Sequence, residues 1–151
     1  MAHAAFDKLK QFVYDVGVDL TSANAVGVAL VQESNATIIT SAATVEDVMS
    51  ISPLGDTSLP LTQVSGTGYS SPGQYLQNVI VSATGGIGYI DADDLTWTNS
   101  TISAGGALMY LKGATPETGI PLAYYDLSVT RISTNGPFTL QWNNEGLLTI
   151  E

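Results

Sequence analysis

The hydrophobic positions of this chain fall into short runs that alternate with turn-forming residues. Val26–Val31 is a continuous apolar run rich in β-branched side chains, which predicts a buried strand. Phe138–Trp142 alternates apolar and polar residues, which predicts a strand with one face toward the core and one toward solvent. The chain shows no sustained helical period, so a parallel α/β sheet is not expected.

Most of the remaining chain repeats this order of strand and turn. We expect further strands at residues 59–64, 78–82, 87–90, 95–97, 101–103, 107–111, 121–125 and 147–150, with turns that include Gly85-Gly86, Gly105-Gly106 and Asn135-Gly136. Short strands about 8–12 residues apart, with turn signals between them, are typical of sandwiches and barrels. The sequence therefore predicts a mainly β protein, a single antiparallel β-sandwich or jelly-roll-like domain with one or two short helices.

Two segments are the candidates for those helices. Ala4–Tyr14 has apolar residues at helical spacing, and Gly17 ends the pattern. Thr44–Ile51 begins at a residue that can cap a helix, with Asp47 at the capping-box spacing, and Pro53 ends it. We divide the chain into an N-terminal helical or docking segment, residues 1–20, and a β-sandwich domain, residues 21–151. Three apolar residues of the first segment are expected to help it dock or swap between subunits: Phe6, Leu9 and Phe12.

The charge of the chain excludes several classes of partner. Of 151 residues only 12% are charged, and four basic residues stand against fourteen acidic ones, which gives a net charge of -10. Nucleic-acid binding and attachment to anionic membranes both need clustered Lys and Arg, so neither is expected. The thinly charged surface must be covered by Ser, Thr, Asn, Gln and Gly, which suits β-sheet faces and protein contacts.

The chain contains no cysteine, so we expect no disulfide framework and no Cys-based metal site. The N-terminus lacks the pattern of a secretory signal. The longest nearly uninterrupted apolar run, Ala25–Val31, is far shorter than the ~20 residues that span a bilayer. We therefore expect a soluble protein made without an export signal.

Few residues of the chain suggest catalysis. The single histidine, His3, lies at the extreme N-terminus, where a buried carboxylate is badly placed to orient it. Asp91, Asp93 and Asp94 are the only dense carboxylate cluster. Three interpretations remain open for the cluster: a hard-cation site without EF-hand spacing, a glycosidase pair, or a turn whose carboxylates accept backbone N–H bonds. The turn is the simplest, and we predict no catalytic, cofactor-binding or metal-binding residue.

Two further features have a functional and a structural interpretation. Gly66-Thr67-Gly68 could suggest a phosphate loop, but no helix with a Lys follows, so tight turns explain the glycines better. The aromatic residues are numerous enough for a sugar-binding platform, yet they are also ordinary core and interface material. They are Tyr69, Tyr75, Tyr89, Trp97, Tyr110, Tyr124, Tyr125 and Trp142.

Taken in order, several motifs resemble a family of small virion structural proteins of tailed bacteriophages. They are Gly66-Thr67-Gly68-Tyr69 with Gly73-Gln74-x-Leu76, Asp91-Ala92-Asp93-Asp94-x-x-Trp97, Thr101-Ile102, Tyr110, Leu122–Asp126 and Asn135–Trp142. The similarity covers most of the chain and is weakest over residues 32–58. Ser71-Pro72-Gly73 and Asn143-Asn144-Glu145 depart from the family pattern, and both departures alter turns rather than the scaffold.

The resemblance implies a non-enzymatic capsid decoration, or cement, protein on the outer head surface. Its implied partners are the major capsid protein and itself as a homo-oligomer, with a trimer on a capsid threefold axis as one option. It also implies synthesis in the host cytoplasm and residence in the virion. A tail or head–tail component and a glycan-binding virion adhesin are the alternatives.

Overall fold

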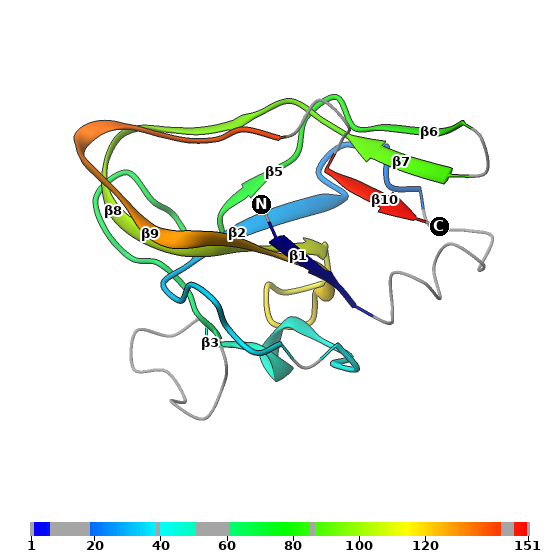
Figure 1. The fold of residues 1–151 in the computed structure, drawn as a ribbon, viewed down its shortest axis with the longest axis horizontal. Helices are drawn as coiled ribbons and strands as arrows, with labels where there is room; N and C mark the ends of the chain where they lie inside the picture. The colour runs from blue at the N-terminus through cyan, green and yellow to red at the C-terminus, as the bar shows by residue number, and fades with distance from the viewer. Residues whose placement is uncertain are drawn as a thin grey trace.

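The computed structural model describes residues 2–6, 19–38, 40–50, 61–84, 87–142 and 147–150. Its strands are β1 (Ala2–Ala5), β2 (Val26–Val31), β3 (Met49–Ser50), β4 (Leu61–Thr62), β5 (Gln74–Tyr75), β6 (Ile80–Thr84), β7 (Ile87–Asp91), β8 (Leu95–Leu111), β9 (Ile120–Leu140) and β10 (Leu148–Ile150) (Figure 1). They form a five-stranded sheet in the order β1-β9-β8-β2-β5, a three-stranded sheet β10-β7-β6, and the short parallel pair β3-β4. The two larger sheets are antiparallel, which confirms the mainly β prediction.

The longest elements are the paired strands β8 and β9, of 17 and 21 residues. The sequence pattern predicted several shorter strands in place of each, and this prediction was wrong. The expected turns at Gly105-Gly106 and Asn135-Gly136 lie inside continuous strands, at or beside shifts in the β8–β9 register. Such irregularities bend and twist a strand without ending it, so turn-forming residues here produce curvature.

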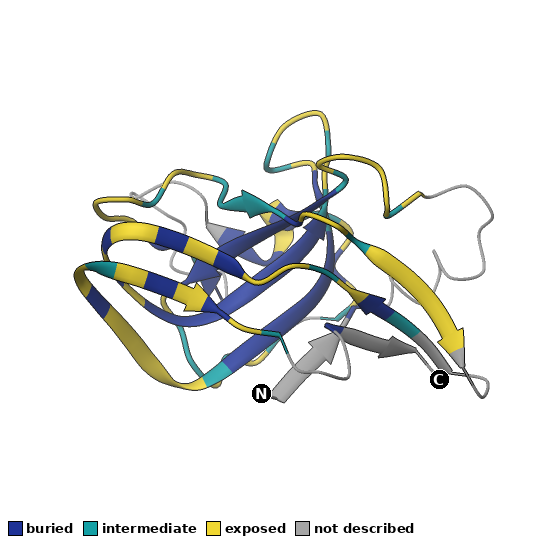
Figure 2. Ribbon diagram, turned by 90° about the horizontal axis from the view of Figure 1, so that it is seen from above, coloured by how far each residue is buried: buried dark blue, intermediate teal, exposed yellow. Residues whose placement is uncertain are grey.

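The β8–β9 ribbon bends back over the rest of the five-stranded sheet and encloses the main core. Figure 1 shows the two strands running together, turning sharply and returning above β2 and β5. Side chains from both ends of the ribbon meet in one buried cluster: Leu95, Trp97, Phe138 and Leu140 from one end, and Ala107, Met109, Leu122 and Tyr125 from the other, together with Val26, Val28 and Leu30 of β2. The inner surface is buried and the outer surface of the bend is exposed (Figure 2).

The N-terminal residues join the same sheet. Ala4 and Ala5, expected to begin a helix, belong to β1, which pairs antiparallel with β9. Phe6 is fully buried in a second core cluster, and its N–H donates to Leu122 O at 3.0 Å. The Phe6 side chain is thus buried in the core of its own chain, whereas the sequence predicts that it helps to dock the segment between subunits. The remainder of the expected helix, with Leu9 and Phe12, lies outside the described residues.

The second expected helix is reduced to a 3-10 turn, η1 (Val45–Asp47). Asp47 Oδ2 accepts the N–H groups of Ala43 at 3.1 Å and Thr44 at 2.9 Å, and the Thr44 hydroxyl at 2.9 Å. The capping role of Asp47 is therefore confirmed. These hydrogen bonds lower the pKa of the Asp47 carboxyl, and those from Thr44 have the largest effect. The helix does not continue because Met49 pairs with Leu61 in the β3-β4 ladder.

Candidate interaction surface

The carboxylates of the acidic corner between β7 and β8 accept internal hydrogen bonds. Asp93 Oδ2 accepts the Asn78 side-chain amide at 2.7 Å, and Asp94 Oδ1 accepts the N–H of Trp142 at 2.9 Å. The Trp142 indole N–H also donates to Asp93 O at 3.0 Å, and Asp91 Oδ1 accepts the N–H of Ala92 at 2.9 Å. Each of the three carboxylates thus accepts a hydrogen bond from a neighbouring group, which agrees with the turn interpretation of this cluster.

No three His, Cys, Asp or Glu side chains of the described residues lie together in a way that could hold a metal ion. His3 lies in β1, where it pairs with Tyr125 of β9. The structure therefore does not bring His3 into the acidic corner between β7 and β8.

The glycine-rich segment forms tight turns against the sheet. Gly68 has a φ of 80° and Gly73 a φ of 109°, the left-handed region that glycine adopts without strain. A Cβ atom on Gly73 would also collide with the carbonyl oxygen of Val28. These glycines bring the backbone close to β2 and β8, as the turn interpretation requires.

Tyr69, which follows these turns, fastens the segment to β2. Its hydroxyl accepts the N–H of Leu30 at 3.0 Å and the side-chain amide of Gln63 at 3.3 Å. Its ring stacks on Trp97, with centroids 6.0 Å apart and planes 26° apart. Burial raises the pKa of Tyr69 to about 12. The side chain closes the edge of β2, whose main-chain groups would otherwise lack partners.

Most of the aromatic side chains point into the fold. Trp97, Tyr110, Tyr124 and Tyr125 are buried, and Tyr125 donates its hydroxyl proton to Leu147 O at 2.9 Å. Tyr75 is half-buried and lies under the Lys112 ammonium, 5.3 Å from the ring centroid. The buried rings cannot stack on an external sugar, so the geometry gives little support to an aromatic platform.

The bend of the β8–β9 ribbon is the most conspicuous exposed surface on the large sheet. Between the pairs Ala104–Arg131 and Gly106–Asp126, β8 has one residue and β9 has residues 127–130. The extra residues of β9 form a bulge in the ribbon. Val129 is 52% exposed and Ile132 is 73% exposed, with the exposed Arg131 side chain between them in sequence.

The buried carboxylate of Asp126 fixes the shape of this bulge. Asp126 Oδ1 accepts the N–H of Ser128 at 2.8 Å and the N–H of Asn35 at 3.0 Å. Both donors belong to residues with left-handed backbone, at φ 65° for Ser128 and 55° for Asn35. One oxygen thus joins the bulge to the loop after β2.

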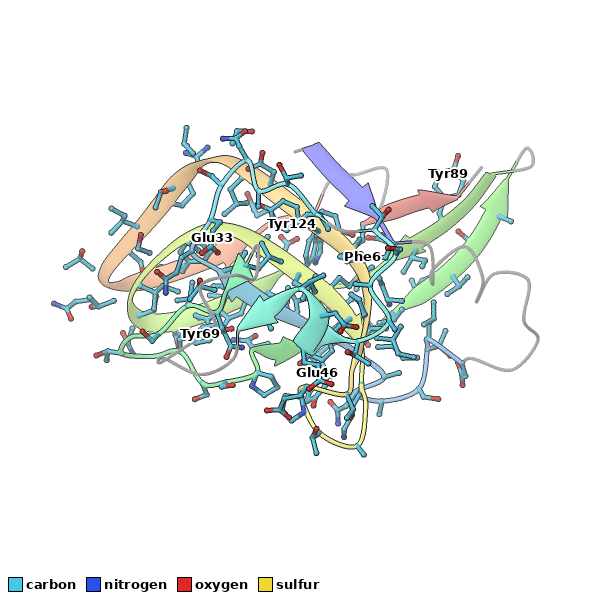
Figure 3. All side chains as sticks on the ribbon, turned by 90° about the horizontal axis from the view of Figure 1, so that it is seen from below. Phe6, Glu33, Glu46, Tyr69, Tyr89 and Tyr124 are labelled. Carbon is cyan, nitrogen blue, oxygen red and sulfur yellow. The ribbon has the colours of Figure 1, made fainter. Side chains whose placement is uncertain are left out.

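Tyr124 supports the same loop from below the bulge. Its hydroxyl donates to Glu33 O at 3.1 Å (Figure 3), and its ring covers Gly106, where a Cβ would meet the ring at 2.6 Å. Because the bulge and the loop share these anchors, the bend presents Val129, Arg131 and Ile132 on a pre-organised backbone.

Sequence reasoning missed this surface, because it placed no strand between residues 125 and 135. The available signal for a strand was the group of β-branched residues Val129, Thr130 and Ile132. The hydrogen bond from the Asn35 N–H to Asp126 joins residues 91 positions apart, and no local pattern indicates it.

No family model, curated protein or solved structure matches the chain. In the part of the chain that the structure describes, no helix has the length and apolar character needed to cross a membrane. The virion resemblance therefore rests on the sequence motifs quoted above.

Proposed function

We propose that this protein is a non-enzymatic capsid decoration protein of a tailed bacteriophage, bound to the outer surface of the head and stabilising it. Its partners in this proposal are the major capsid protein and further copies of itself in a small homo-oligomer. The bent sheet then acts as a single jelly-roll-like β-sandwich. The protein is made in the host cytoplasm and joins the capsid surface without contacting nucleic acid or membrane.

The contrast between the corners of the fold and the bend supports this proposal. In the acidic corner and the glycine turns, polar groups form internal hydrogen bonds with donor–acceptor distances of 2.7–3.3 Å. The bend instead exposes Val129, Arg131 and Ile132 on a backbone held by Asp126. Apolar side chains with Arg are typical of protein interfaces. We assign the capsid contact to this bend.

Charge supports an exterior position. A chain with a net charge of -10 is repelled by packaged DNA, and Arg131 is a local positive group that suits an acidic or polar position on the capsid. Binding only to the assembled head stabilises it by RT ln(1 + [L]/Kd), about 2.7 kcal/mol when the free protein stands at a hundred times its Kd.

The first test is the copy number and position of the protein in purified virions, measured by quantitative mass spectrometry and cryo-electron microscopy. Copies over the whole head surface support decoration. A few copies at the tail would move the assignment to a tail or head–tail component or an adhesin. Absence from the particle would overturn the virion proposal altogether.

The second test addresses the bend. Val129→Lys should weaken co-sedimentation with heads that lack the protein, because it places a charge in the apolar contact. Ala114→Lys is the matched control, since it adds the same charge at an exposed position in the loop that joins the far end of the ribbon. Equal binding by the two variants would remove the capsid contact from the bend.

A further inference from the structure

Residues 80–83 of strand β6 are exposed on both faces, and one edge of the strand has no partner among the described residues. It lies at the outside of the sheet β10-β7-β6, and among the described residues it pairs only with β7. Ile80 is 59% exposed and Val81 is 53% exposed, and Ser82 and Ala83 are exposed as well. Because neighbouring strand residues point to opposite faces, neither face of β6 is covered (Figure 2).

This edge has none of the usual protection against strand pairing. Natural edge strands carry Lys, Pro, inward charges or bulges that discourage another strand from adding. Ile80–Thr84 contains no charged residue and no proline, and its register with β7 is regular over all five residues. The edge of β2, in contrast, is closed by the Tyr69 hydroxyl on Leu30 N–H. Among the described residues, the edge of β2 is thus completed by other groups, whereas the outer edge of β6 has no partner strand.

We propose that β6 pairs antiparallel with β6 of a second copy of this chain about a two-fold axis. The two three-stranded sheets then form one continuous sheet across the dimer. A register centred on Ser82 uses all five residues of β6. It sets Ile80 of each copy opposite Thr84 of the other, and Val81 opposite Ala83.

The chemistry of the strand favours a second copy as the occupant. Two chains of net charge -10 repel one another over most of their surfaces, but β6 brings together two strands without a charged side chain. A basic partner would find no acidic residue within the strand itself. In the proposed register Val81 of each strand also lies opposite the small Ala83 of the other, so the edge complements itself.

Pairing through β6 places the self-association of the proposed function on a defined surface and gives it two-fold symmetry. The β6 pairing rests on the proposed function only in this respect. The capsid contact lies on a different surface, the bend of the β8–β9 ribbon. A monomer that decorates heads would remove the β6 pairing and leave decoration intact. A protein that dimerises through β6 but is absent from virions would keep the β6 pairing and remove decoration.

Sedimentation equilibrium of the full chain over a micromolar concentration series tests the pairing. We expect a monomer–dimer equilibrium, with Val81→Lys weakening dimerisation by about tenfold or more, because each symmetric interface then gains two like charges. Val129→Lys is the matched control, since Val129 is 52% exposed and lies on the bend. A wild-type monomer at every concentration, or equal dimerisation of the two variants, would overturn the proposal.

A single introduced cysteine tests the register, because the chain has none of its own. Directly opposed residues of an antiparallel pair have Cα atoms about 4.5–5.5 Å apart, which a disulfide can bridge. Ser82→Cys should therefore form a covalent dimer under mild oxidation, while Ser103→Cys, at an exposed serine of β8, should not. Equal cross-linking of the two variants would overturn the register centred on Ser82.

Discussion

The hydroxyl of Tyr69 lies 3.0 Å from the main-chain nitrogen of Leu30 and accepts its proton, although the two residues are 39 positions apart. Leu30 also accepts a main-chain bond, from Val64 N–H at 2.9 Å. A side chain and a neighbouring loop segment thus complete the edge of β2 beyond the short strand β5.

Tyr69→Phe should lower the free energy of unfolding by about 1–3 kcal/mol, because it leaves the buried N–H of Leu30 without its acceptor. Urea denaturation followed by fluorescence measures the change. Tyr75→Phe is the matched control, since the Tyr75 ring is half-buried at the periphery and its contact with Lys112 uses the ring face. Equal losses in the two variants would contradict the role given to the Tyr69 hydroxyl.

The buried tyrosines should make the fold sensitive to alkali. Burial raises the pKa of Tyr69 from 10.0 to about 12, and it also raises the pKa values of Tyr110, Tyr124 and Tyr125. The folded state therefore holds these phenolic protons more tightly than the unfolded chain does. Their contribution to stability is complete below about pH 10 and is lost as the pH rises through the folded-state values.

Urea unfolding at a series of pH values from about 8 to 12 checks this expectation. The free energy of unfolding should fall steadily above pH 10, and the fall should be shallower in Tyr69→Phe. A flat profile up to pH 12 would show that burial does not hold these protons.

Asp126→Ala should destabilise the bend, because it removes the acceptor of the Asn35 and Ser128 N–H groups. We expect a loss of about 1–3 kcal/mol and faster hydrogen exchange over residues 127–132. Asp126→Asn is the informative control, since both bonds end on Oδ1 and an amide oxygen can accept them in the same place. If Asp126→Asn lowers the free energy of unfolding as much as Asp126→Ala does, the stabilisation comes from the negative charge and not from the position of the acceptor oxygen.

Gly73→Ala should cost at least about 2 kcal/mol, because a Cβ would collide with the Val28 carbonyl and the φ of 109° is strained for alanine. Gly136→Ala offers a comparison within β9. The nearest atom to a Cβ there is Thr134 O at 3.7 Å, an ordinary contact, so its urea midpoint should stay close to wild type. Similar midpoints for both variants would argue against the close approach at Gly73.

Adding millimolar calcium should leave the melting temperature unchanged, because the carboxylates of Asp93 and Asp94 are engaged by Asn78 and Trp142. Differential scanning fluorimetry with and without a chelator measures this. A calcium-dependent rise that Asp93→Asn abolishes would restore the cation interpretation of the acidic corner.

The sequence predicted well where structure follows from local chemistry. The apolar run at Val26–Val31 is β2, and the turn chemistry of Asp91–Asp94 and the cap at Asp47 are as expected. It failed where the outcome depends on distant contacts. Asn135-Gly136 has the signature of a hairpin turn, yet pairing with Ser100 carries β9 through it.

The candidate surface was hidden from the sequence for a related reason. The bulge at Ser128 depends on a carboxylate that also bonds a loop 91 residues away, and exposure of Ile132 depends on where the ribbon bends. Periodicity detects which residues can form a strand, but it does not show which long-range contact will curve that strand.

The placement of β1 has a consequence for the order of events during synthesis. Ala2–Ala5 pair with residues 123–126, so during synthesis β1 has no partner strand until those residues have been made. The β8–β9 ribbon closes over a short loop and can form early, whereas pairing of β1 closes the much longer loop between Ala5 and Ala123. β1 is therefore expected to join the sheet after the β8–β9 ribbon has formed, and Phe6 completes the second core only at that stage.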